Sequence, residues 1–578
     1  MEMLHKILEL WGFLSKRRHR QFWILIGIML VASIAEIFSL GAVLPFLGAI
    51  TSPEMVYQHA YMQPFVKLLN IKSADQIILP VSCIFIGFAL FAGAIRILLV
   101  YILTRFSFAT GADLSVTIYR RTLFKPYEEH IDCNSSEVIN GIMTKTNTVI
   151  GGIIIPTLNG MSSLVLLVSI MFTLLVINPT ITLITFGIFF CLYVTIFLSM
   201  RRNLHKNGEH IAKQTTVMLR SLQEGLGGIR DVLVDGTQEY YCNLYKSADY
   251  QFRRASGTNV IITSSPRFAM EAVGMALIAS LAYWMFKEDN STTIPLLGAL
   301  ALGAQRMLPV LQNLYSSYGT ITGGDASFQD VLDLLNTPSP AYADQPPGDL
   351  VPFNKSITLD EVSFRYKSNS LYVFKDINLT INKGSCVGFI GQTGCGKSTM
   401  LDVIMGLLSI SEGKLRVDGE SITKKNVREW QGHISHVPQT IYLADLTIME
   451  NIALGIAKGN IDEERVVRAA KKAKIHDTIS KLDSKYETMV GEGGARLSGG
   501  QRQRIGIARA LYKETSVLIF DEATSALDNQ TELNVMDEIR QLGDGITVLI
   551  ITHRLSSLKG CDHVYEVSGG RLLEKQSI

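Results

Sequence analysis

Apolar residues are unevenly distributed along this chain of 578 residues. Up to about residue 320 they form long runs, whereas beyond residue 350 they come in short pieces with the lengths of single strands and helices. A helix needs about 20 consecutive apolar residues to cross a hydrocarbon core about 30 Å thick, and the long runs reach that length. The pattern predicts a membrane-embedded first half and a water-soluble second half.

Six runs in the first half are long enough to cross a membrane. They lie at residues 22–49, 77–106, 147–177, 180–200, 258–286 and 292–320. An even number of crossings returns the chain to the side where it began. The basic run Lys16–Arg20 precedes the first crossing and predicts that this side is the cytoplasm. We expect an all-α domain of six membrane helices at residues 22–336, surrounded by the lipid bilayer.

Two amphipathic segments flank the first crossing. Residues 1–21 contain one apolar helical face, formed by Leu4, Ile7, Leu8, Trp11 and Leu14. Residues 52–70, on the outer side, also alternate between an apolar and a polar face. Both segments suit helices that lie in the membrane interface, the first as a cytoplasmic elbow and the second as an external helix. The same pattern fits helices packed against their own chain, and both readings remain open.

The second half is set apart by its composition. Residues 337–350 contain four prolines and no apolar periodicity, which predicts a linker before a domain at 351–578. The net charge of +2, from 54 basic and 52 acidic residues, argues against nucleic acid as a partner. The seven cysteines show no metal-ligand spacing, and we expect reduced thiols.

A glycine-rich loop follows a predicted buried strand at 386–390 and precedes a predicted helix. It reads Gly391-Gln-Thr-Gly-Cys-Gly-Lys-Ser398, the pattern of a phosphate-binding loop. The glycines let backbone N–H groups wrap phosphates, Lys397 reaches the β- and γ-phosphates, and Ser398 ligates Mg²⁺. The predicted nucleotide-binding residues are Gly391, Gln392, Thr393, Gly394, Cys395, Gly396, Lys397, Ser398 and Thr399.

A second apolar strand, at 517–520, ends in Asp521 and Glu522. Paired acids at a strand end are ordinarily part of a solvated turn. With a phosphate-binding loop upstream, Asp521 is predicted to belong to the Mg²⁺ shell. Glu522 is predicted to be the general base that activates water against the γ-phosphate.

Between these motifs lies Leu497-Ser-Gly-Gly-Gln501, at the start of a predicted helix. This sequence resembles the signature of the ATP-binding cassette (ABC) ATPases. Three single residues fit the same family: Tyr366 resembles its adenine-stacking aromatic, Gln439 its Q-loop glutamine at the metal and the water, and His553 its switch histidine. The segment Ser525–Asp528 resembles its D-loop.

The resemblance implies an α/β P-loop ATPase domain that binds ATP and Mg²⁺ and works as a homodimer. In that family each ATP lies between the phosphate-binding loop of one subunit and the signature of the other. The catalytic residues would be Glu522, His553 and Gln439, and the metal ligands Ser398, Gln439 and Asp521. The residues that bind ATP in trans would be Leu497, Ser498, Gly499, Gly500, Gln501 and Asp528.

The order of the two halves resembles bacterial ABC exporters of the MsbA-like class, in which each chain is a half-transporter. The resemblance implies a multi-pass protein of the plasma membrane (the bacterial inner membrane) with the ATPase domain in the cytoplasm. The cytoplasmic turns near 122–135 and 236–245 resemble the coupling helices of these exporters.

Three arginines lie inside predicted crossings, where charges are costly and often functional: Arg96, Arg267 and Arg306. Three readings are open: one basic cavity for an anionic head, side chains that snorkel to headgroups, or structural pairs such as Arg267 with Glu271. The membrane half resembles the PglK-type flippases of lipid-linked oligosaccharides. That resemblance implies that the arginines bind a pyrophosphate-linked glycan lipid and that the segment 52–70 engages its tail.

Two other functions remain open. The first is a multidrug, peptide or other lipid exporter with the same ATPase, which a cavity rich in aromatics and poor in charges would favour. The second, from another class, is an ATP-gated channel or a regulatory membrane protein. The presence of both Glu522 and His553 favours ATP turnover over gating.

Overall fold

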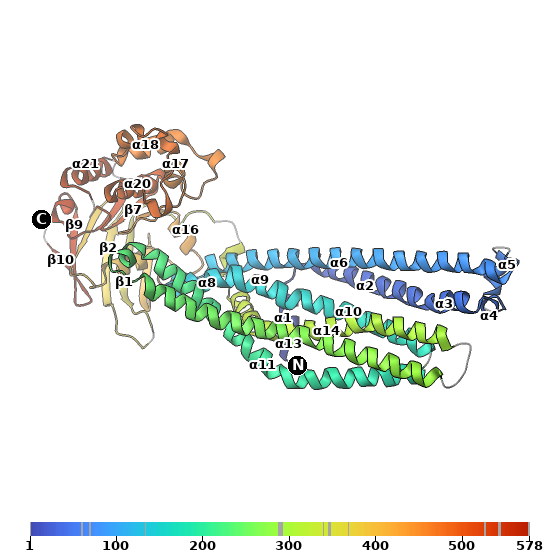
Figure 1. Cartoon of the computed structure of the whole chain (residues 1–578). Coiled ribbons are helices and arrows are strands. Elements are labelled where there is room, and N and C mark those ends of the chain that lie inside the picture. The colour runs from blue at the N-terminus through green and yellow to red at the C-terminus, as the bar shows by residue number, and fades with distance from the viewer. Residues whose placement is uncertain are drawn as a thin grey trace. The chain divides into compact units, whose positions relative to one another are not determined.

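The computed structural model describes residues 2–58, 62–68, 71–132, 135–177, 179–286, 293–338, 340–344, 348–367, 369–524, 527–541 and 545–575. The chain folds into two compact units (Figure 1). Unit 1 comprises Met1–Phe124 and Cys133–Pro338, and unit 2 comprises Lys125–Asp132 and Ser339–Ile578. A short piece of the first half of the sequence therefore belongs to the second unit.

The described residues of unit 1 form helices joined by short turns. Its elements are α1 (Glu2–Gly12), α2 (Lys16–Gly41), α3 (Val43–Thr51), α4 (Pro53–Gln58), α5 (Gln63–Leu68), η1 (Ala74–Ile77), α6 (Ile78–Leu123), α8 (Ser135–Asn140), α9 (Thr146–Val149), α10 (Ile155–Ile177), α11 (Pro179–Gly227), α12 (Ile229–Val234), α13 (Gln238–Phe286) and α14 (Thr293–Asn336). Two π-helical turns, Gly141–Lys145 and Ile150–Ile154, join α8, α9 and α10.

Four helical stretches of the described residues are long and apolar enough to cross a membrane: Lys16–Thr51, Ala74–Leu123, Val138–Val176 and Pro179–Gly227. The fifth and sixth predicted crossings lie in α13 and α14, which span 49 and 44 residues. Both helices carry charges in their apolar parts, among them Arg267 and Arg306. Both helices are long enough to cross a hydrocarbon core about 30 Å thick.

Close backbone approach holds the long helices of unit 1 together. A Cβ atom added at Gly208 of α11 would lie 2.4 Å from the carbonyl oxygen of Gly323 on α14. Real Cβ atoms do not approach a backbone atom so closely, so only glycine fits this crossing. Small residues at helix contacts are typical of membrane domains, where packing must replace the hydrophobic driving force.

The two amphipathic segments have more detail than the sequence predicts. Helix α1 packs through Leu10, which is buried, and Lys6, which pairs with Asp325 at 2.7 Å, while Leu4 and Leu8 are exposed. The helix therefore contacts its own chain on one face and leaves an apolar face free. The segment 52–70 contains two short helices, α4 and α5, where one is expected, and residues 59–61 and 69–70 of it lie outside the described part.

The two cytoplasmic turns also differ from expectation. The expected segment 122–135 contains α7 (Tyr127–Asp132), which belongs to unit 2: Ser409 N–H donates to Glu128 Oε1 at 2.5 Å. The second turn was expected near 236–245, and the structure has a turn at 235–237, which overlaps only the start of that range. Residues 238–245 already lie in α13, and the short helix of the turn is α12, at 229–234. The glycine at 228 ends the preceding helix earlier than the sequence suggests.

Unit 2 has two sheets. One has the strand order β2-β1-β4-β5 and the other β10-β9-β3-β8-β7-β6. The strands are β1 (Ser356–Phe364), β2 (Phe374–Asn382), β3 (Cys386–Ile390), β4 (Glu412–Val417), β5 (Glu420–Ser421), β6 (Ile434–Val437), β7 (Val517–Asp521), β8 (Thr547–Ile551), β9 (His563–Ser568) and β10 (Arg571–Lys575).

The helices of unit 2, besides α7, are short and lie between these strands. They are α15 (Lys397–Ile404), α16 (Val427–Gln431), α17 (Ile448–Ile452), α18 (Glu463–Lys472), α19 (His476–Ser480), α20 (Gly499–Tyr512) and α21 (Asn529–Arg540). Strands β3, β8, β7 and β6 run parallel, and β3, β8 and β7 are mostly apolar, as expected for strands covered on both faces. Their carboxyl ends meet at one edge, where loops of an α/β sheet form ligand sites.

Candidate functional site

The glycine-rich loop leaves β3 at this edge and enters α15. Gly391 has a φ of +146°, and a Cβ there would lie 2.4 Å from the carbonyl oxygen of Val567. Gly396, which precedes α15, has a φ of +99°. These positions need glycine, and the loop they shape brings its backbone to the N-terminus of α15, where anions bind. Lys397 is buried, and its Nζ donates to the carbonyl oxygens of Gly391 and Gln392 at 2.9 Å each.

Asp521 ends β7 beside this loop. Burial raises the pKa of its carboxyl, although a hydrogen bond from Ser398 acts in the opposite direction. Burial also lowers the pKa of the neighbouring His436, on β6. A carboxylate and a hydroxyl supply the oxygen ligands that Mg²⁺ prefers. No group of three or more His, Cys, Asp or Glu among the described residues would hold a metal alone, so a cation here would also need phosphate oxygens.

The next residue, Glu522, lies between the other two predicted catalytic residues. Its Oε1 is 2.8 Å from Nε2 of His553, and its Oε2 accepts a hydrogen bond from Nε2 of Gln439 at 2.8 Å. Its φ is +48°, which is uncommon for a residue other than glycine. Backbone strain of this kind clusters at functional sites, where the surrounding structure holds it. The structure thus brings Glu522 together with Gln439, which lies 83 positions before it, and with His553, which lies 31 positions after it.

Two further predicted residues lie beside the loop or at a helix start. Tyr366 is 52% exposed, and its hydroxyl is 3.1 Å from Thr399 Oγ1, so its ring is available beside the phosphate-binding loop. Asp528 is the N-cap of α21. Hydrogen bonds from the side chain and backbone of Thr531 hold the pKa of Asp528 below its ordinary value. Ser525 and Ala526, at the start of the predicted D-loop, lie outside the described residues.

The predicted signature forms the start of α20. Ser498 is the N-cap: its hydroxyl accepts from Gln501 N–H at 3.3 Å, and Gln501 Oε1 accepts from Ser498 N–H at 2.8 Å. This reciprocal capping box fixes the loop, while Gly499 and Gly500 keep it free of bulky side chains. None of the hydrogen bonds described for this chain joins it to Lys397.

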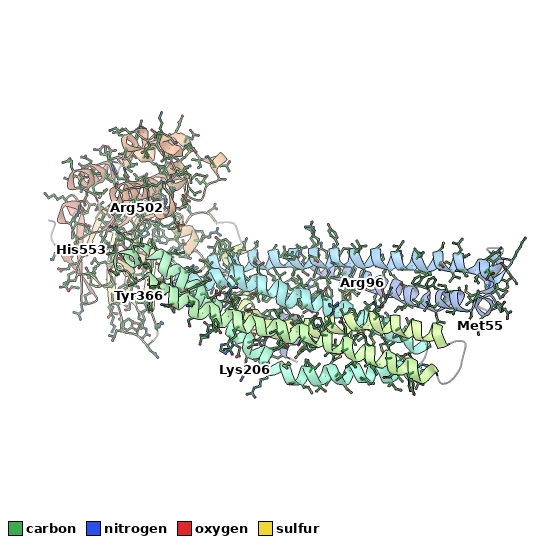
Figure 2. The ribbon with its side chains drawn as sticks, in the orientation of Figure 1. Met55, Arg96, Lys206, Tyr366, Arg502 and His553 are labelled. Carbon is green, nitrogen blue, oxygen red and sulfur yellow. The ribbon has the colours of Figure 1, made fainter. Side chains whose placement is uncertain are left out.

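The three membrane arginines have different surroundings. Arg96 is exposed on α6 (Figure 2), Arg267 pairs with Glu271 of its own helix at 2.8 Å, and Arg306 pairs with Glu36 of α2. Glu36 is buried, with 4% of its surface exposed. The pairing of Arg267 with Glu271 was one of the alternatives open from the sequence. Two of the three charges are thus compensated within unit 1.

Comparison with known families assigns both halves of the chain. Residues 31–287 match the ABC transporter transmembrane region, and residues 374–525 match the ABC transporter family. The chain belongs to the ABC transporters. The match implies that unit 2 of this ABC transporter binds a nucleotide, and it makes the chain a multi-pass plasma-membrane protein with its ATP-binding domain on the cytoplasmic side.

Three known proteins are similar to this ABC transporter. An ATP-dependent lipid A-core flippase of Francisella tularensis is 30% identical over 399 residues, which are 68% of this chain and 64% of the relative. One of Burkholderia pseudomallei is 28% identical over 476 residues, 80% of this chain and 78% of the relative. The match thus spans slightly less than two thirds of the Francisella protein.

The third is a solved structure. A bacterial Atm1-family ABC exporter with ATP bound has a TM-score of 0.77 and 24% identity, covering 96% of this chain and 94% of that chain. At this identity the likeness concerns the fold. It confirms the expected class, a helical membrane domain followed by an α/β ATPase domain.

Sequence reasoning missed two acidic residues of this ABC transporter. Glu36 lies within an apolar run, where a charge is as costly as it is for the three arginines, and this could have identified it from the sequence. Glu532 of α21 is 1% exposed and lies four positions before Met536 and seven before Ile539, both buried. A carboxylate on the apolar face of a helix was the available signal. Cys386 and Cys561, which appear scattered in sequence, have their sulfurs 2.9 Å apart.

Proposed function

We propose that this ABC transporter hydrolyses ATP to flip an anionic glycolipid across the plasma membrane, and that the cargo is a lipid-linked oligosaccharide. The observation that carries the ATPase part is the position of Glu522 between His553 and Gln439 at 2.8 Å each. A carboxylate held from both sides keeps one orientation, which is what a base that aligns water for in-line attack needs.

The proposed chemistry assigns one task to each residue. Glu522 accepts the proton of the attacking water, and His553 steadies the base and the γ-phosphate. Lys397 exchanges its contacts with the loop carbonyls for phosphate oxygens. Ser398 and Asp521, with Gln439, would hold Mg²⁺, which supplies positive charge at the phosphates.

We further propose that the working unit is a homodimer. The N-terminus of α20 is an anion site by its capping and its helix dipole, yet it makes no described contact with the phosphate-binding loop of its own chain. A second copy of the chain would present this end to the ATP, with Asp528 beside it. ATP hydrolysis by detergent-solubilised protein should then fall more steeply than linearly on dilution into the monomeric range.

The membrane arginines support an anionic cargo, but the three are not equally available to bind it. Arg96 has no ion-pair partner among the described residues, so it is the charge most available to a phosphate. Arg267 and Arg306 each already have a carboxylate. A pyrophosphate would have to replace Glu36 at Arg306, and because guanidinium binds phosphate and carboxylate in the same fork geometry, this exchange is chemically reasonable.

A lipid tail has a candidate place in unit 1. A pocket of about 320 Å³ between α2, α3 and α6 is almost wholly apolar, and its walls include Phe38, Pro45, Phe88 and Met62 of the external segment. Met55 of α4 is exposed at one end of the long helices of unit 1 (Figure 2). The names of the lipid A-core flippase relatives favour a second cargo of the same chemistry, a phosphorylated glycolipid with acyl chains in place of a polyprenyl chain.

The experiment measures ATP hydrolysis and lipid translocation together in proteoliposomes. Arg96→Ala and Arg267→Ala should lower flipping of a fluorescent polyprenyl-pyrophosphate oligosaccharide by at least 10-fold, since losing a desolvated charge pair costs about 2–5 kcal/mol. Basal ATP hydrolysis should persist. Arg253→Ala is the matched control, because Arg253 pairs with Asp249 four residues away on the same helix as Arg267.

A second arm offers lipid A-core glycolipid in place of the polyprenyl lipid. Transport of that lipid alone would replace the proposed cargo and keep the flippase. Normal flipping by Arg96→Ala and Arg267→Ala would contradict the role of the arginines. No ATP-dependent translocation of either lipid would favour a drug or peptide exporter or a gated channel.

A further inference from the structure

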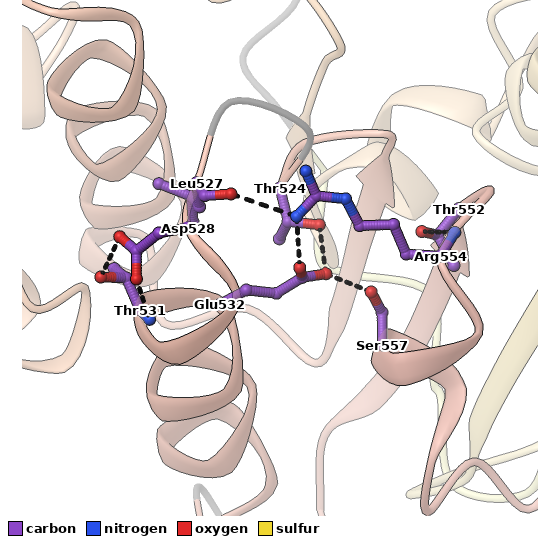
Figure 3. Close-up of polar contacts among 8 residues, drawn as sticks. All are labelled: Thr524, Leu527, Asp528, Thr531, Glu532, Thr552, Arg554 and Ser557. Carbon is purple, nitrogen blue, oxygen red and sulfur yellow. Dashed lines mark hydrogen bonds and ion pairs between the residues drawn. The ribbon is translucent and has the colours of Figure 1, made fainter.

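Three hydrogen bonds converge on the carboxylate of Glu532, the buried acid of α21 (Figure 3). Thr524 Oγ1 donates to its Oε1 at 2.9 Å, and Ser557 donates to the same oxygen. Arg554 donates through one guanidinium nitrogen to Glu532 Oε2 at 2.8 Å and to the carbonyl oxygen of Leu527 at 3.1 Å. Glu532 thus joins its own segment, which includes Thr524 and Leu527, to the segment that contains Arg554 and Ser557.

Both segments adjoin predicted site residues. Thr524 is two residues after Glu522, Arg554 directly follows His553, and Leu527 directly precedes Asp528. None of the groups bonded to Glu532 is itself a predicted site residue. The network therefore does not include Glu522 or His553 themselves. It fixes the backbone next to them, and so sets where their side chains lie.

The carboxylate of Glu532 is buried, with 1% of the residue exposed, so its charge needs partners within the protein. A carboxylate without water is stable only when its oxygens are fully paired, and this one has two hydroxyl donors and a guanidinium. Such networks have one geometry because every member needs its partners. A flexible turn would leave Glu522 and His553 free to separate, whereas their observed distance is 2.8 Å.

We propose that Glu532 is a positioning residue for ATP hydrolysis, which fixes the pair formed by Glu522 and His553 to the D-loop through Arg554. The inference rests on the proposed ATPase activity. It assigns no contact with ATP to Glu532. It adds that a displacement of the D-loop at Leu527 moves Arg554 and, with it, the adjacent switch histidine.

The test is a comparison of steady-state kinetics for the full chain in proteoliposomes. Glu532→Gln keeps the shape and an acceptor oxygen but removes the charge that holds Arg554. We expect kcat for ATP to fall by about 100-fold, the loss typical of a displacement of about 1 Å at a catalytic group, with KM within about threefold. Glu538→Gln is the matched control, because Glu538 is on the same helix and pairs with Lys474 at the surface.

A double-mutant cycle distinguishes the proposed positioning role of Glu532 from a purely structural role. If Glu532 acts only through Glu522 and His553, Glu532→Gln added to Glu522→Gln should slow the residual hydrolysis by less than threefold. A structural defect would instead lower the activity of both backgrounds by the same factor. Arg554→Lys retains the charge and gives a second route to the measurement if Glu532→Gln yields too little protein; we expect it to lower kcat by about 10-fold.

The outcomes are distinct. Wild-type kcat in Glu532→Gln or Arg554→Lys overturns the inference, and so does a 100-fold loss in both backgrounds of the cycle. Absence of ATP hydrolysis in the wild-type chain overturns the proposed function and this inference together. A loss of kcat restricted to the background with Glu522 intact supports the inference, whatever lipid is transported.

Discussion

Substitutions at the ion pair between Arg306 and Glu36 distinguish an effect on the stability of the fold from an effect on cargo binding. Glu36 has 5% of its side chain exposed, inside a predicted membrane helix, and Arg306 is its ion-pair partner. Replacing Arg306 by alanine leaves a buried carboxylate without its partner, which typically costs about 3–5 kcal/mol. Replacing both residues removes the buried charges together, and such double replacements are often nearly neutral.

The prediction is therefore a non-additive cycle for stability. Arg306→Ala should lower the unfolding midpoint of the detergent-solubilised protein clearly, and Glu36→Ala combined with it should restore the midpoint to near the wild-type value. Flipping should behave differently. It should remain low in the double variant, because the guanidinium that receives the anionic head is absent even though the fold is intact.

Glu36→Gln completes the comparison. It leaves Arg306 without its internal carboxylate, so the pyrophosphate head should bind more tightly and be released more slowly. The assay measures, for each variant, thermal unfolding, basal ATP hydrolysis and translocation of a polyprenyl-pyrophosphate oligosaccharide. Normal flipping by the stable double variant would refute the reasoning, because Arg306 would then be only the partner of Glu36.

Three other predictions concern separate parts of the molecule. Glu522→Gln should lower ATP hydrolysis by 10²–10⁴-fold while ATP binding, measured by equilibrium dialysis, persists, because only the base is removed. Burial and the charge of Asp521 raise the pKa of Asp402, in α15, to about 6. Protonation of Asp402 therefore contributes to the stability of the folded protein fully below pH 4, and this contribution is lost as the pH rises through 6. Asp402→Asn should therefore stabilise the protein by about 1 kcal/mol at pH 7.5 in EDTA, after solvent screening, with little effect at pH 4, as thermal unfolding at both pH values would record. Gly208→Ala should cost about 1–3 kcal/mol, measured by the same unfolding assay, because its Cβ would meet the backbone of Gly323.

The ATP-binding unit is largely predictable because its chemistry lies in contiguous motifs. The loop at 391–398 needs its glycines for backbone reasons, and the apolar strand before Asp521 and Glu522 places both acids at the sheet edge. The roles of these residues remain predictions until measured. The contact of Gln439 with Glu522 joins segments 83 residues apart. Motif spacing could not predict this contact, which is known only from the folded structure.

The membrane unit was less predictable, for two physical reasons. Apolar runs mark helix lengths but carry no information on which helix faces which, so the partner of Arg306 could not be read from the sequence. Helix ends also depend on local backbone features: the glycine at 228 ends α11 before the polar stretch does, and the segment 52–70 breaks into α4 and α5. Glu532 was missed because a charged residue in a helix is usually read as solvent-facing.

The central claim is that ATP hydrolysis by this ABC transporter moves an anionic glycolipid across the membrane. The most direct measurement is the loss of a labelled polyprenyl-pyrophosphate oligosaccharide from the ATP-exposed leaflet of proteoliposomes. We predict that the wild-type protein moves the lipid only with ATP and Mg²⁺, and that Glu522→Gln binds ATP but does not move it. Equal translocation by the wild-type protein and Glu522→Gln, or translocation without ATP, would contradict the account.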